Sequence, residues 1–117
     1  MSKKIAICST GSSPSSQIDE RFGRCSHFMI WDPETKQYAP LSNSGTEAAH
    51  GAGTGAVQAL LKNDVGLVIS HRIGPKAFGA LAQGGIKVFS GIAGKTVEAA
   101  LQSYQAGELQ ELLSPNS

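Results

Sequence analysis

Ile5-Ala6-Ile7-Cys8 is a continuous apolar run that lies between Lys3-Lys4 and a polar, serine-rich stretch at residues 9–16. Four apolar residues in succession, bounded by polar ones, indicate a strand that is buried on both faces in the centre of an α/β sheet. Cys8 then stands at the carboxyl end of this strand, where open α/β sheets place their ligand sites. We therefore place the rest of the chain around this run.

Four other segments have the pattern of strands, and three have the period of helices. The strands are expected at residues 28–31, 37–41, 65–69 and 86–89. Asp32-Pro33 favours a turn between the first two, and Pro40 marks an edge strand because it cannot donate to a ladder. The first helix is expected to begin in the glycine-rich entry at residues 50–55, with its N-terminus at Gly51, and the others to begin at Pro75 and after the N-cap Thr96. They are expected to end before Asn63, Gly84 and Gly107, respectively.

This order of elements predicts a three-layer α/β domain with a mixed, five-stranded sheet. An initial meander followed by alternating helices and strands gives the strand order 3-2-1-4-5, with strand two antiparallel and three main helices. We expect a single domain over residues 1–117, with its core at about 4–109. Residues 110–117 are expected to be a tail. Within residues 108–117, Leu109, Leu112 and Leu113 have the spacing of one more helical turn.

Composition excludes several classes of protein. The net charge is +1 and no stripe of Lys and Arg is present, so nucleic acid is not an expected partner. No apolar run is long enough to span a membrane, and the first residues lack the apolar core of a signal peptide. Cys8 and Cys25 are too few for a disulfide framework, so we expect a cytoplasmic protein with reduced thiols.

The candidate binding segment is Asp19-Glu20-Arg21-Phe22-Gly23-Arg24-Cys25-Ser26-His27, called the arginine segment below. It follows the first strand at the carboxyl end, where the fourth strand also ends in Ser70-His71. We therefore expect the segment, Cys8 and His71 to converge. Helix N-termini at Gly51 and Gly74 add backbone N–H groups that favour an anion. The alternative is an ordinary surface connection with solvated arginines.

The residue types at this edge suit an anionic, sulfide-rich metal cluster. Thiolate and imidazole are ligands for iron, and guanidinium and N–H groups neutralise cluster charge. A metal-dependent nuclease is disfavoured because the central strand carries no carboxylate. A Cys/His pair also permits a small cysteine-dependent enzyme, although no third, orienting group is evident.

Four stretches of the chain resemble the dinitrogenase iron-molybdenum cofactor-binding and biosynthesis family, in the family's order and spacing. The resemblance runs from about residue 4 to residue 109. It is carried by Ile18-Asp19-Glu20-Arg21-Phe22-Gly23-Arg24-Cys25, His50-Gly51-Ala52-Gly53, Ile73-Gly74-Pro75-Lys76-Ala77-Phe78-Gly79-Ala80-Leu81 and Gly94-Lys95-Thr96-Val97-Glu98-Ala99-Ala100-Leu101. It implies a ribonuclease H-like fold without the acidic active site, and binding of an iron–molybdenum cofactor or a related iron–sulfur precursor rather than catalysis.

One position departs from the family pattern. Many members carry a histidine before the Phe-Gly pair, whereas this chain has Arg21. Arginine stays protonated and cannot ligate iron. Metal bonds would then come from other residues, or the cluster would be held by charge.

The leading hypothesis is therefore a non-enzymatic carrier of an iron–sulfur or iron–molybdenum cluster, with cofactor-assembly proteins as partners. The alternatives are a metal-free protein-interaction module and the cysteine-dependent enzyme. Candidate cofactor contacts are Arg21, Phe22, Gly23, Arg24, Cys25, His50, Gly51, His71 and Gly74, and candidate metal ligands are Cys8, Cys25, His27 and His71.

Overall fold

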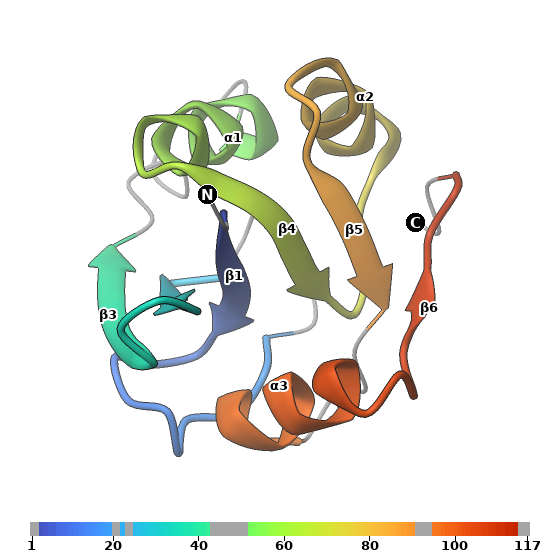
Figure 1. Cartoon of the computed structure of the whole chain (residues 1–117). Helices are drawn as coiled ribbons and strands as arrows, with labels where there is room; N and C mark the ends of the chain where they lie inside the picture. Colours follow the sequence, from blue (N-terminus) through green and yellow to red (C-terminus); the bar gives the residue numbers. More distant parts are fainter. Residues whose placement is uncertain (1–2, 20–21, 23–24, 43–51, 91–94, 115–117) are drawn as a thin grey trace.

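The computed structural model describes residues 3–19, 22, 25–42, 52–90 and 95–114, with only the backbone described at 52–56. A mixed sheet lies between helices on both of its faces (Figure 1). In chain order the elements are β1 (Lys4–Ser9), β2 (His27–Asp32), β3 (Gln37–Ser42), α1 (Ala52–Lys62), β4 (Val65–Ser70), α2 (Pro75–Gln83), β5 (Lys87–Ser90), α3 (Val97–Gln105) and β6 (Gln110–Glu111). No helix in these ranges has the length and apolar character needed to cross a membrane.

The sheet has the strand order β3-β2-β1-β4-β5-β6. β1 pairs antiparallel with β2 and parallel with β4, and β4 pairs parallel with β5. These pairings confirm the predicted mixed sheet, its order over the first five strands and the antiparallel second strand.

The prediction of five strands was wrong, because the tail contributes a sixth. Gly107, at φ 76°, turns the chain after α3, and Gln110–Glu111 then pairs antiparallel with β5. The Leu112 N–H donates to the Val88 carbonyl at 2.8 Å, and Leu112 packs against the core. The leucines of the tail therefore do not form a helical turn: Leu109 and Leu112 flank β6 and pack against the two core clusters, and Leu113 is exposed.

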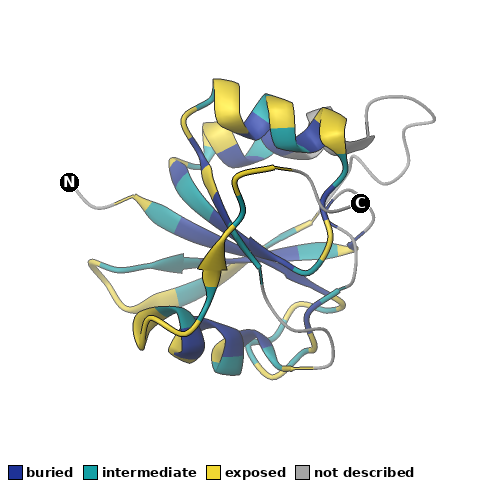
Figure 2. Cartoon of the chain, turned by 90° about the vertical axis from the view of Figure 1, so that its right-hand side faces the viewer, coloured by how far each residue is buried: buried dark blue, intermediate teal, exposed yellow. Residues whose placement is uncertain are grey.

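Strand β1 supplies side chains to both layers of the core. Ile5 and Ile7 pack with Val97, Ala100 and Leu101 of α3. Ala6 and Cys8 point to the opposite face and belong to the core cluster that includes residues of α1 and α2. The middle of the sheet is largely buried, with helices on either side of it (Figure 2). The alternation is the period of two that any strand must show, and burial on both faces confirms β1 as the central strand.

The helix ends follow the predicted signals. Pro75 occupies the first turn of α2, and Gly85 follows the helix at φ 76°, a conformation that favours glycine. Thr96 caps α3, because its hydroxyl accepts a hydrogen bond from the Ala99 N–H at 3.2 Å.

Replacing Thr96 with alanine tests this cap. The Ala99 N–H would lose its acceptor, so we expect the Thr96→Ala variant to lose about 1 kcal/mol of unfolding free energy. Urea denaturation followed by circular dichroism measures the change. Gln102→Ala, an exposed position on the same helix, is the matched control and should change stability by only a few tenths of a kcal/mol. Equal losses in both variants would contradict the cap.

Candidate functional site

The carboxyl ends of β1 and β4 lie side by side at one edge of the sheet. Ile7 is the register partner of Ile69, so the polar residues that follow each of them end neighbouring strands. Ser9 and Ser70 are both fully buried. The Ser9 hydroxyl bonds the Gly11 carbonyl at 2.7 Å, and the Ser70 hydroxyl bonds the Arg72 carbonyl at 3.1 Å. Each serine therefore satisfies its own buried hydroxyl and holds the turn that leaves its strand.

The serine-rich stretch after β1 covers the N-terminus of α3. The carbonyl of Ser16 accepts from the Val97 N–H at 2.9 Å, and the carbonyl of Pro14 accepts from the Glu98 N–H at 3.1 Å. The Ile18 N–H in turn donates to the Lys95 carbonyl at 2.8 Å. These bonds use donors at the start of α3 that would otherwise attract an anion.

The described parts of the arginine segment are fixed to the ends of both strands. The Asp19 N–H donates to the Cys8 carbonyl at 3.2 Å, and the Phe22 N–H donates to the Arg72 carbonyl at 3.0 Å. The segment thus meets the β4–α2 connection, as the sequence predicted. Arg21, Gly23 and Arg24 lie outside the described residues, as do His50 and Gly51.

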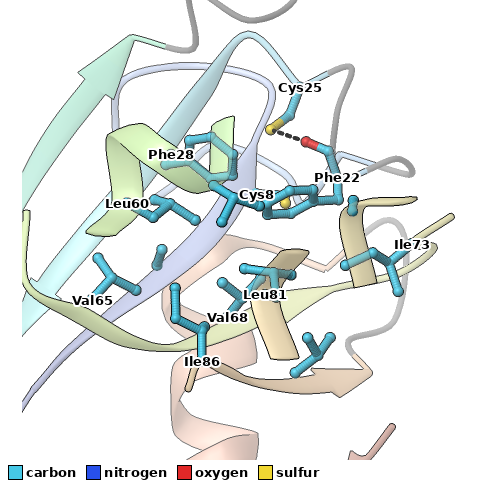
Figure 3. Close-up of a cluster of buried hydrophobic side chains, with 14 of the residues drawn as sticks. Cys8, Phe22, Cys25, Phe28, Leu60, Val65, Val68, Ile73, Leu81 and Ile86 are labelled. Atoms are coloured by element: carbon cyan, nitrogen blue, oxygen red, sulfur yellow. Dashed lines mark hydrogen bonds between the residues drawn. The ribbon is translucent and has the colours of Figure 1, made fainter. Parts of the chain in front are cut away.

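Phe22 and Cys25 are core residues in this structure. The Phe22 ring is 1% exposed and lies 5.4 Å from the Phe28 ring, centroid to centroid. The Cys25 thiol is fully buried and donates to the Phe22 carbonyl at 3.2 Å (Figure 3). Both were predicted as cofactor contacts, and the structure places both side chains in the core, on either side of Gly23-Arg24 in the sequence.

Cys8 lies in the same core cluster as Cys25, and both residues are thiols. Burial raises the pKa of the Cys8 thiol well above its ordinary value, and the neighbouring Cys25 thiol and Asp19 carboxylate raise it further. A hydrogen bond with Ser70 acts in the opposite direction but does not reverse the shift. Cys8 is therefore protonated at neutral pH and is a poor nucleophile in this conformation.

His27 lies apart from this thiol pair. His27 begins β2, and alternation from Phe28 places it on the face that α3 covers, whereas Cys8 and Cys25 are on the face of α1 and α2. The His27 Nδ1 lies 3.2 Å from the Ser26 hydroxyl. His71 follows β4 and is half-buried. Across the part of the chain that the structure describes, no three His, Cys, Asp or Glu residues are grouped as a metal site.

The N-terminus of α2 is the anion-favouring element at this edge. Gly74 occupies the N-cap in an extended conformation and has no side chain to cap the helix. Pro75 lacks an N–H, so the first backbone donor of the helix is that of Lys76. Arg72 and Lys76, which flank this turn, are both exposed. Neither residue was among the predicted contacts, although their place beside a glycine–proline helix start was a usable signal.

Two hollows formed by described residues lie away from the carboxyl ends of β1 and β4. A groove of about 400 Å³ lies between α2, β5 and the tail and is lined by Phe78, Ile86 and Leu112, among other residues. A smaller hollow lies between β2, β3 and the start of β1. Neither contains a residue of the arginine segment.

The raised pKa of Cys8 makes stability depend on pH. The folded protein keeps this proton at pH values where the unfolded chain has lost it, so the stabilisation is fully present below about pH 8.5 and is lost as the pH rises. We expect the free energy of unfolding to fall with a slope approaching 1.4 kcal/mol per pH unit above about pH 8.5.

Urea unfolding of the wild type and of Cys8→Ala between about pH 7 and 9.5 measures this slope. The variant should have the flatter profile. Tyr38, whose pKa is raised by burial and by the Glu98 carboxylate, ionises above this window. Identical slopes in the two proteins would show that Cys8 is not the responsible group.

Known structures share this fold over nearly their whole length. The apo form of the orange protein from Desulfovibrio gigas is 34% identical, with 100% of this chain and 98% of that one covered and a TM-score of 0.95. A candidate NifB protein from Thermotoga, assigned to the DUF35 family, is 32% identical, with 99% and 98% covered and a TM-score of 0.88. An uncharacterised protein of Methanocaldococcus jannaschii is 28% identical over 98 residues, which are 81% of this chain and 82% of that one.

A family match covers the strand ends and the segments that meet there. Residues 2–107 match the family described as dinitrogenase iron-molybdenum cofactor. This range includes the arginine segment, both strand ends and the start of α2. The chain therefore belongs to the dinitrogenase iron-molybdenum cofactor family.

Proposed function

We propose that this protein binds an anionic metal–sulfur cluster, of the iron–sulfur or iron–molybdenum type, at the carboxyl end of β1 and β4. The observation that carries the proposal is the hydrogen bond from the Phe22 N–H to the Arg72 carbonyl. It joins the segment that contains two arginines to the turn that begins α2. The family match supports a cofactor of this class.

The distribution of charge supports an anionic ligand at this edge. Five of the ten Lys and Arg residues belong to the segments that meet here, namely Arg21, Arg24, Arg72, Lys76 and Lys95. The same segments carry three acidic residues, Asp19, Glu20 and Glu98. A net charge of +1 for the chain therefore conceals a local excess of positive charge. The uncapped start of α2 adds the positive end of a helix dipole.

The chemistry of the thiols favours a cluster held mainly by charge and hydrogen bonds. Cys8 is buried and protonated, so metal coordination would require both loss of its proton and opening of the core. Cys8, Cys25, His27 and His71 remain our candidate ligands. Among them His71 is the first to test, because it is half-buried and stands in the connection between β4 and α2. Guanidinium groups at Arg21 and Arg24 would supply donors to the sulfides of the cluster.

We further propose that the protein acts as a carrier rather than as an enzyme. A cysteine-dependent reaction needs an activated thiolate, and the raised pKa of Cys8 works against one. Cofactor-assembly proteins are the partners, and the cytoplasm the location, that fit carriage of an oxygen-sensitive cluster. We also assign the fold to a ribonuclease H-like variant, with β6 as an addition to the edge of the implied five strands.

Anaerobic reconstitution with ferrous iron and sulfide, with and without molybdate, tests the proposal. We expect the desalted protein to retain iron and visible absorption above those of a buffer control. Arg21→Ala and Arg24→Ala should each weaken retention on the order of tenfold, the cost of losing a charge-assisted hydrogen bond. Added salt should weaken it further.

The matched control is Lys62→Ala, which removes one exposed positive charge at the far end of α1. It should leave retention unchanged. Iron content equal to that of the buffer control would refute cluster binding. A loss in Lys62→Ala as large as in the arginine variants would refute the placement of the site.

A further inference from the structure

We propose that Cys8 and Cys25 form a redox pair, which closes to an intramolecular disulfide and ties the arginine segment to β1. Both thiols are also candidate cluster ligands, but in this structure they are buried and come from different elements of the fold. Their oxidation is a modification that stands apart from cluster binding.

The two sulfurs are neighbours in the core. Cys8 is the register partner of Phe28, and Cys25 stands three residues before Phe28 in the chain. Both thiols are 0% exposed and belong to one cluster on the α1 and α2 face (Figure 3). The pKa of Cys8 is raised first by burial and then by the adjacent Cys25 thiol. Cys8 lies near the end of β1, and Cys25 lies on the segment that returns over this end. A movement of that segment would bring the two sulfurs into bonding distance.

A hydroperoxide is the oxidant class that balances the reaction. Because Cys8 is a poor nucleophile, we assign the attack to Cys25: its thiolate attacks the peroxide, the O–O bond breaks, and the sulfur becomes a sulfenic acid as water or an alcohol leaves. The second thiol then displaces the sulfenic oxygen as water, and the S–S bond forms. The two thiols lose two electrons and two protons, and one peroxide molecule takes them up.

Closure of the pair changes how the arginine segment is held. The Cys25 thiol loses the proton that it donates to the Phe22 carbonyl, so that hydrogen bond is lost. In its place a covalent bond joins the end of the segment to β1, in addition to the hydrogen bond between the Asp19 N–H and the Cys8 carbonyl. Residues 9–24 become a closed loop with fewer open states. Any effect on cluster retention rests on the proposed function, whereas the disulfide itself does not.

The test uses the full-length protein without cluster, reduced and then treated anaerobically with hydrogen peroxide. After remaining thiols are blocked, a denaturing tryptic digest without reductant separates the two cysteines, because Arg21 and Arg24 lie between them. We expect residues 5–21 and 25–36 to appear as one cross-linked peptide from a monomeric protein. Reductant should restore both thiols.

Cys8→Ala and Cys25→Ala serve as controls, and each should give no intramolecular cross-link. Overoxidised or unreacted thiols in the wild type, or a cross-link found only in dimers, would overturn the pairing. A native trypsin digest tests the second half of the proposal. Cleavage after Arg21 and Arg24 should slow several-fold in the oxidised protein, and an unchanged rate would show that the disulfide does not fix the segment.

Discussion

Strand β1 is buried on both of its faces, and this burial obliges the polar groups at its carboxyl end to find partners within the protein. The Cys8 carbonyl accepts from the Asp19 N–H, and the Ser9 hydroxyl is satisfied by the turn at Gly11. These bonds bring the chain back over the strand end immediately after it leaves. This requirement alone, without a ligand, explains why Asp19, the first residue of the arginine segment, lies at the edge of the sheet.

Two helices begin at this edge of the sheet, α2 and α3. They differ in whether the N–H groups at the N-terminus already have hydrogen-bond acceptors within the protein. Backbone carbonyls of Pro14 and Ser16, with the Thr96 hydroxyl, occupy the N-terminus of α3. The start of α2 has a glycine at its cap and basic residues on either side. Two helices that begin at the same edge of a sheet thus differ in what they offer to an anion. A low net charge does not reveal this difference, because the balancing acids lie largely elsewhere in the chain.

Much of the fold could be predicted from local signals. The unbroken apolar run before Ser9, Pro75 at a helix start and Thr96 at a cap each have one dominant physical meaning. The strand β6 could not be predicted, because two residues are too few to show a period and their pairing depends on the position of β5. The helical spacing of the tail leucines is misleading, because Leu109 and Leu112 flank β6 and pack against different core clusters.

The site was harder to predict than the fold. A phenylalanine and a cysteine within a run of charged residues resemble an exposed loop, yet Phe22 and Cys25 are core residues that hold that loop. The separation of His27 from Cys8 follows from the pleat of the sheet, which requires the register to be known. Arg72 and Lys76 could be recognised as part of the site only from the structure. There the hydrogen bond from the Phe22 N–H to the Arg72 carbonyl places the arginine segment beside their turn.

Hydrogen exchange of individual amides, compared in the anaerobically reconstituted and untreated protein, tests the central claim most directly. If a cluster binds at the carboxyl end of β1 and β4, the amides of Asp19, Phe22 and Lys76 should exchange more slowly when it is present. Amides of β3, on the far edge of the sheet, should be unaffected. Protection confined to the groove around Leu112, or unchanged exchange at Phe22 and Lys76 in protein that retains iron, would contradict the account.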